Sequence, residues 1–159
     1  MGTRGLIGFI IRGQRHGSYN HGDSYPSHLG KYIKEFILSL TPEEYDTMAR
    51  LVNEIIWFDP TSTPSPELQD RYQRAGFADL RVSEKRLSDW YCLLYKTQGA
   101  AALPAIKSGE LQHMPESTDF LEDGLFCEWA YFIDFENKKL ETWKNGELLG
   151  ELPFEKLVV

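Results

Sequence analysis

The sequence predicts a single α+β domain in which a mixed or antiparallel sheet, formed by an N-terminal hairpin and a C-terminal meander, is covered by helices. Strand-like patterns occur at both ends of the chain, and two amphipathic helical patterns follow the first hairpin. The chain has 159 residues, which is within the usual size of one domain. Because no repeat, low-complexity tract or change of composition divides it, residues 1–159 are expected to fold as one unit.

The first predicted strand covers residues 4–11. After Arg4 this segment is almost wholly apolar and includes three isoleucines, a pattern typical of a strand that is buried on both faces. Residues 12–14 predict a turn, and residues 15–21 predict the returning strand of a β-hairpin. Glycine, aspartate, serine and proline in residues 22–27 predict a loop.

Two helices are predicted next, over residues 28–40 and 41–56. In the first, apolar side chains recur at helical spacing: Leu29, Ile33, Phe36, Ile37 and Leu40. The second begins with a capping box, in which Thr41 caps the helix, Glu44 reaches back to it and Pro42 suits the first turn. Both helices are expected to pack on the sheet, because a strand that is apolar on both faces needs cover on both.

The middle of the chain has weaker patterns. Residues 59–66 hold three of the eight prolines and predict a loop. The remaining expectations are helices over 66–76 and 83–97, a short helical turn over 100–108 that Pro104 breaks, and a loop over 113–123.

The C-terminal end predicts a meander of three strands. Aromatic residues alternate with others over 125–135, residues 136–138 turn the chain, and residues 140–143 return. Asn145-Gly146 is typical of a tight hairpin turn, and residues 148–152 predict the last strand.

Composition and charge narrow the class of partner. The chain carries 24 acidic and 17 basic residues, a net charge of −7, which argues against general nucleic-acid binding and against adhesion to an anionic membrane surface. No apolar run reaches membrane-spanning length, and the first strand lacks the basic start and cleavage site of a signal peptide. We therefore expect a cytoplasmic protein without a membrane partner, and the sequence leaves its oligomeric state open.

The cysteines and histidines predict no metal site and no cofactor. Cys92 and Cys127 lie 35 residues apart in aromatic, apolar surroundings, so we expect buried, reduced thiols rather than a disulfide or a metal pair. The four histidines show no HxxxH or HExxH spacing.

The N-terminal hairpin brings together the most informative polar residues. If Ile11 pairs near Arg15 or His16, the start of the first strand lies opposite residues 21–24. The candidate ligand-binding residues at this open end are Thr3, Arg4, Asn20, His21, Asp23, Ser24 and Tyr25. This set suits a small polar or anionic ligand or a peptide terminus, because Arg4 supplies a forked donor and its neighbours supply a carboxylate, an imidazole and hydroxyls.

Three alternatives remain open for this cluster. Arg4 and Asp23 could form an ion pair that only closes the sheet end, while Asn20 and Ser24 stabilise turns. A hydrolase or transferase could use His21 in acid–base chemistry, with Asp23 orienting it and Arg4 anchoring an anion. A protein-interaction module is favoured if the aromatic residues are exposed. We favour binding, because no nucleophile or metal is evident and catalytic residues cannot be assigned.

The same segment resembles an uncharacterised family of small proteins. The shared pattern is the opening MGTRG, residues 1–5, followed by YNxxDSYPxxLG over residues 19–30. A weaker likeness covers residues 128–135. The resemblance supports the location of the candidate site and implies no particular chemistry for it.

A looser likeness links the start of the chain to N-terminal-nucleophile hydrolases, in which a first strand, a hairpin and a polar loop surround the catalytic terminus. Their mechanism needs Cys, Ser or Thr as the terminal residue, whose own amine acts as the base. Removal of Met1 here exposes Gly2, and Thr3 could serve only if Gly2 were removed as well. The likeness therefore implies at most a relative that shares the sheet without the activity.

Overall fold

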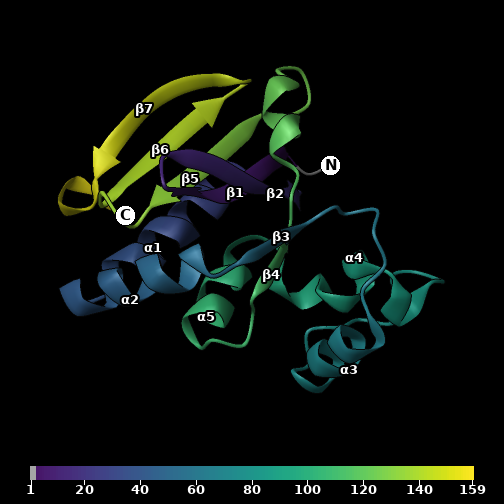
Figure 1. Cartoon of the computed structure of the whole chain (residues 1–159). Coiled ribbons are helices and arrows are strands. Elements are labelled where there is room, and N and C mark those ends of the chain that lie inside the picture. Colours follow the sequence, from purple (N-terminus) through teal and green to yellow (C-terminus); the bar gives the residue numbers. More distant parts are fainter. Residues whose placement is uncertain (1–2) are drawn as a thin grey trace.

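The computed structural model describes residues 3–159, so Met1 and Gly2 of the opening motif lie outside the described residues. This part of the chain forms a five-stranded mixed sheet, a two-stranded sheet and five α-helices (Figure 1). The α+β class is confirmed, and so is the prediction that one sheet joins the N-terminal hairpin to the C-terminal meander.

The elements have the following bounds. The large sheet contains β1 (Arg4–Ile11), β2 (Gln14–His21), β5 (Trp129–Asp134), β6 (Lys139–Lys144) and β7 (Glu147–Pro153), and the small sheet contains β3 (Ile56–Phe58) and β4 (His113–Pro115). The helices are α1 (Lys31–Leu38), α2 (Pro42–Asn53), α3 (Pro66–Arg74), α4 (Trp90–Leu93) and α5 (Ala102–Lys107).

Strand β1 lies inside the large sheet rather than at its edge. The strand order is β2-β1-β5-β6-β7, with β1 antiparallel to β2 and parallel to β5. Residues 5–10 are all buried, as expected for a strand whose isoleucine-rich sequence is apolar on both faces. The prediction of a doubly covered first strand is therefore confirmed.

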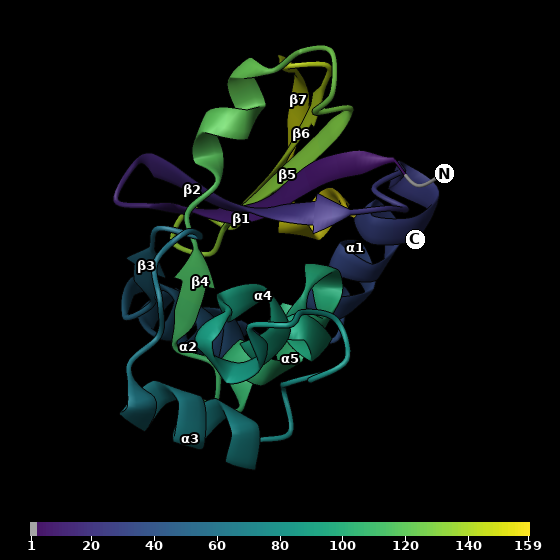
Figure 2. The ribbon, with the colours of Figure 1, turned by 90° about the vertical axis from the view of Figure 1, so that its right-hand side faces the viewer.

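Helices cover one face of the large sheet. In Figures 1 and 2, α1, α2 and α5 lie together beneath the strands. Ile33 and Ile37 of α1 and Met48 of α2 are fully buried, and they belong to one core cluster with Phe9 and Ile133 of the sheet. The helices predicted after the first hairpin thus pack on the sheet as expected.

A short helical turn, Thr118–Glu122, covers the opposite face of the sheet near β2. It is the green turn above the strands in Figure 2. Its Phe120 and Leu121 pack against a second core cluster that includes Leu6 and Phe132. Both faces of β1 are closed in this way.

The two helices after the first hairpin begin in different ways. Thr41 accepts the amide of Glu44, and the Glu44 carboxylate accepts the amide of Thr41, so the predicted capping box is present at the start of α2. The predicted helix over 28–40 begins instead as a π-helical turn, Pro26–Gly30, before α1. The carbonyl of Tyr25 accepts amides from both His28 and Gly30, which widens this first turn.

The continuous helix predicted over residues 83–97 is wrong. This stretch is a series of short turns in which α4 covers only four residues. Asp89 takes an extended conformation and caps α4. The carbonyl of Cys92 then accepts the amide of Asp79, and Lys96 donates its amide to Phe77, so backbone groups that a helix would use internally bind a neighbouring segment.

The loop predicted over residues 113–123 is also wrong in part. It contains β4, which pairs parallel to β3, and then the Thr118–Glu122 turn. Neither three-residue strand is long enough to show an alternating strand pattern in the sequence. The helix predicted over 41–56 ends at Asn53, and its last predicted residue, Ile56, is the first residue of β3. Pro104 does not break its helix, because it is the third residue of α5, where an amide has no partner within the helix.

The cysteines agree with the sequence prediction, since Cys92 and Cys127 are both buried, free thiols. Burial raises the pKa of Cys127 to about 11, which keeps this sulfur protonated and unreactive near neutral pH. Within residues 3–159 no helix has the length and apolar character needed to cross a membrane.

Candidate functional site

The hairpin register brings the predicted site residues together. Arg4 lies directly opposite His21, and the amide of Ser24 donates to the carbonyl of Thr3 at 3.2 Å. The hairpin turn is shorter than expected, because Ile11 pairs with Gln14 rather than with Arg15 or His16. The predicted residues then divide into two groups, a buried trio (Thr3, Asn20, Ser24) and an exposed group (Arg4, His21, Asp23, Tyr25).

The buried trio holds the chain where it leaves the sheet. Asn20 donates to the carbonyl of Gly22 at 3.0 Å and to the hydroxyl of Ser24 at 2.9 Å. The Ser24 carbonyl accepts the Tyr131 hydroxyl of β5 at 2.8 Å. These bonds tie the hairpin end to the neighbouring strand, which is the turn-stabilising role considered for Asn20 and Ser24.

The exposed group does not form the ion pair considered for Arg4 and Asp23, because no salt bridge joins these two side chains within residues 3–159. The Arg4 guanidinium instead lies over the ring of Phe126, 5.5 Å from its centroid. Asp23 adopts a left-handed backbone conformation, with φ of 52°, and its carbonyl accepts the amide of Leu29. His21 shares a 2.8 Å hydrogen bond with the hydroxyl of Tyr19.

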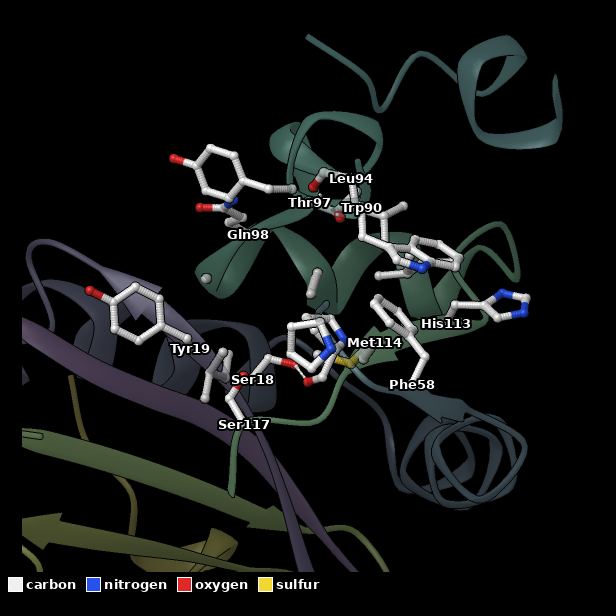
Figure 3. A pocket seen from close by; sticks show the side chains of 17 residues that line it. Ser18, Tyr19, Phe58, Trp90, Leu94, Thr97, Gln98, His113, Met114 and Ser117 are labelled. Atoms are coloured by element: carbon white, nitrogen blue, oxygen red, sulfur yellow. Dashed lines mark hydrogen bonds between the residues drawn. The ribbon is translucent and has the colours of Figure 1, made fainter. Parts of the chain in front are cut away.

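A cavity of about 160 Å³ lies next to this cluster, where the hairpin meets the small sheet and the turns around α4 (Figure 3). Seventeen residues line it, and they come from β1, β2, the segment from Trp90 to Ala102, and the two strands of the small sheet with residues next to them (Pro60, Leu111 and Ser117). Most of the wall is apolar, and its aliphatic part includes Ile7, Leu94 and Met114.

Stacked aromatic rings close one end of the cavity. Phe58 and Trp90 stack with centroids 3.9 Å apart and planes at 21°. In Figure 3 the imidazole of His113 lies beside them, on the side away from Tyr19. The Tyr72 hydroxyl oxygen accepts the amide of Gln112 and lies 2.5 Å from His113 Nδ1.

Burial favours the neutral form of His113. It lowers the pKa of the imidazole, and the charge of Arg71 adds to this effect. The only lining residue that could carry a positive charge is thus kept neutral at ordinary pH.

Three polar groups in the wall have defined hydrogen-bonding states. The Ser18 hydroxyl donates to the carbonyl of Pro115 at 2.7 Å, and the Thr97 hydroxyl donates to the carbonyl of Leu94 at 2.9 Å. The indole N–H of Trp90 is buried and finds no acceptor among the described residues. Buried polar groups usually have partners, but this N–H is shielded from the cavity as well as from solvent, as is the N–H of Trp57.

The open end of the cavity carries Tyr19 and Gln98, which Figure 3 shows on the side away from Trp90 and Phe58. Tyr91, which is 46% exposed, also borders this end. Gly99 completes the rim in a left-handed conformation, with φ of 63°, and a Cβ there would lie 2.8 Å from Asn20 Oδ1. The predicted polar cluster therefore adjoins the cavity through the neighbouring residues Tyr19 and Asn20.

Sequence reasoning located the polar cluster but missed the cavity. Its walls come from segments between Ile7 and Ser117, and none of them carries a local motif. The aromatic fraction of 13% was the one signal, since such richness points to bulky packing or ring-lined clefts.

A second polar cluster, His16 with Glu116 and Thr118, serves to fasten the edge strand. His16 Nδ1 lies 2.8 Å from the Glu116 carboxylate, which also accepts the Thr118 hydroxyl, and Thr118 accepts the amide of Gly17. The His16 ring stacks on Trp57. Within residues 3–159 no group of three or more His, Cys, Asp or Glu side chains is arranged to hold a metal ion.

Comparisons with protein-family models, with curated proteins and with solved structures found no match to this chain. The functional argument therefore rests on the geometry of the cavity and of the hairpin end.

Proposed function

We propose that this protein binds a small, largely apolar molecule in the cavity between the hairpin and the turns around α4. The observation that carries the proposal is the cavity itself, whose 160 Å³ of space is bordered mainly by aliphatic and aromatic side chains. Apolar concave sites with a few polar groups are the usual form of small-molecule sites in proteins. Binding requires only this complementarity, whereas catalysis would also require a positioned reactive group.

Filling the cavity tests the proposal. Ala102 is buried and lines the cavity, while the adjacent Ala101 is exposed and does not. Ala102→Leu is expected to abolish binding of small apolar compounds, and Ala101→Leu is the matched control that should leave binding unchanged. For the unmodified chain, a ligand at ten times its dissociation constant should raise Tm by about 3–6 °C in a thermal-shift measurement.

The methionines provide a direct readout of where a ligand binds. The sequence contains three methionines, of which Met114 lines the cavity and Met48 is fully buried in the main core. In a spectrum of ¹³C-labelled methionine methyl groups, a ligand in the cavity should move the Met114 signal and leave Met48 in place. Failure of every apolar compound to move Met114 would exclude the proposed site.

A second candidate function is the binding of a polar or anionic ligand at the hairpin end. It is favoured by the register, which sets the exposed Arg4 directly opposite the exposed His21. Arg4→Lys keeps the charge but loses the fork that grips a carboxylate or phosphate. It is expected to reduce affinity about tenfold and to cost about 1 kcal/mol of stability or less.

The thermal-shift measurement also tests whether a ligand binds at the hairpin end. Nucleotides, sugar phosphates and small carboxylates are the compounds to test. His21→Gln keeps a hydrogen-bonding side chain but removes the titratable imidazole, so loss of turnover with binding kept would indicate an enzyme. If none of them stabilises the protein, and Arg4→Lys and Asp23→Asn change only stability, the cluster is structural.

A further inference from the structure

The chemistry of the cavity narrows the class of ligand, and this inference rests on the function proposed above. Size sets the first limit. An apolar cavity of roughly 150 Å³ in another protein accommodates benzene, and the cavity here has about 160 Å³. A single ring with a small substituent fits this space, whereas a nucleotide or a long acyl chain does not.

The walls favour an aromatic ring over an aliphatic one. Phe58 and Trp90 form a stacked pair at one end, and Figure 3 shows the Met114 sulfur beside them. Aromatic rings attract one another in offset and edge-on arrangements, and thioether sulfur makes favourable contacts with ring edges. A bound ring would meet both kinds of partner.

Charge is excluded from the interior. None of the 17 lining residues is an aspartate, glutamate, lysine or arginine, and burial keeps the one histidine neutral. A carboxylate or an ammonium group placed here would lose its hydration without an opposite charge to replace it. The ligand is therefore neutral in the part that enters the cavity.

The polar groups of the wall define what the ligand must offer. The hydroxyl protons of Ser18 and Thr97 are already given to backbone carbonyls, so both oxygens can only accept a hydrogen bond from a ligand. Ser18 belongs to β2 and Thr97 to the turn after α4, so an acceptor is present on either side of the cavity.

We infer that the cavity takes a neutral, single-ring phenol, whose hydroxyl group donates to Ser18 or Thr97. A phenolic hydroxyl supplies the donor that these two acceptors require, and its ring meets the aromatic and thioether contacts. Toluene has the same shape without the hydroxyl, and benzoate has the ring with a charge.

Titrations with phenol, toluene and benzoate, followed by calorimetry and by the Met114 methyl signal, test the class of ligand. Phenol is expected to bind about three- to tenfold more tightly than toluene, since the hydroxyl gains a net hydrogen bond. Benzoate at pH 7.5 should not move the Met114 signal, because its charge keeps it out of the cavity. Thr97→Val combined with Ser18→Ala should remove most of the preference for phenol while toluene affinity stays within about twofold.

The outcomes separate this inference from the function on which it rests. A toluene affinity equal to that of phenol, or a benzoate affinity as high, overturns the phenol assignment while the cavity remains a site for apolar molecules. If neither phenol nor toluene moves the Met114 signal, both the inference and the proposed function are wrong.

Discussion

Gly5 shows how one residue without a side chain fixes the hairpin against the rest of the sheet. A Cβ at this position would lie 2.1 Å from the carbonyl oxygen of Trp129 and 2.8 Å from the side chain of Ser24. The first obstacle is backbone of the neighbouring parallel strand, so it cannot rotate away. The start of β1, the buried trio and β5 can therefore approach each other only because residue 5 is glycine.

Gly5→Ala is predicted to destabilise the protein by about 3 kcal/mol or more, because either β5 or the segment at Ser24 must move. Gly150→Ala in β7 is the control, since a Cβ there meets nothing within 4 Å, and it should change stability by about 0.5 kcal/mol or less. Urea denaturation of the two variants measures the difference. Equal stability of both would contradict the close approach described at Gly5.

At the scale of single elements, α2 is the helix whose start depends most clearly on side chains. Thr41 and Glu44 exchange hydrogen bonds with each other's amides, and the lysine of α5, Lys107, lies 2.7 Å from the Glu44 carboxylate. The hydrogen bond from the Lys107 ammonium and the hydrogen bond from the Thr41 amide lower the pKa of Glu44. Glu44 therefore both caps the start of α2 and joins α2 to α5.

Thr41→Ala is predicted to cost about 1 kcal/mol, the usual effect of losing an N-cap hydroxyl. Thr47→Ala in the same helix is the matched control. Thr47 is exposed and donates only to the carbonyl of Glu43 one turn earlier, so its replacement by a better helix former should leave stability unchanged or slightly higher. Thermal unfolding monitored by circular dichroism compares the two, and a smaller loss for Thr41→Ala than for Thr47→Ala would refute the capping role.

The accuracy of the sequence predictions varied among elements for physical reasons. β1 and α2 were predictable because their signals, an apolar run and a capping box, are local. β3 and β4 were missed because each has three residues and exists only through pairing with the other, more than fifty residues away. The helix predicted over 83–97 does not form because the Cys92 carbonyl and the Lys96 amide bond to Asp79 and Phe77, a tertiary contact that helical spacing does not reveal.

At the scale of the whole molecule, the cavity is a product of the long-range pairing that the sequence does not display. Its aromatic end depends on β3 lying beside β4, and its rim depends on Gly99 meeting Asn20 of β2. The polar cluster could be predicted from hairpin register, because one turn determines it. Which of its members are buried could not, since that depends on Tyr131 and on the turns around Gly99.

The stability of the whole molecule in acid depends on two contacts that each join distant elements. The Tyr72–His113 bond joins α3 to the small sheet, and the Arg15–Glu141 pair joins β2 to β6 across the large sheet. Burial lowers the pKa of His113. Burial alone would raise the pKa of Glu141, but hydrogen bonds from Arg15 and Trp143 lower it. In both cases the unfolded chain binds the proton more readily than the folded one.

Stability is therefore predicted to fall with acid in two stages. Above about pH 6.5, His113 is neutral in both states and contributes no slope, and below this value protonation of the unfolded chain begins to lower the free energy of unfolding. Glu141 adds a second loss below about pH 4.5, where the unfolded carboxylate takes up its proton first. Urea denaturation across about pH 2.5 to 8 measures the free energy of unfolding at each pH and covers both stages.

Substitution of each residue tests whether His113 causes the first loss of stability and Glu141 the second. His113→Gln should remove the slope that begins as the pH falls through about 6.5, while His28→Gln, at an exposed histidine, should retain it. Glu141→Gln should flatten the profile only below about pH 4.5, although it lowers stability at neutral pH by leaving Arg15 without its carboxylate. A wild-type profile that is flat from pH 7 to 5 would show that His113 is not held neutral by burial, and the interior of the cavity could then carry charge.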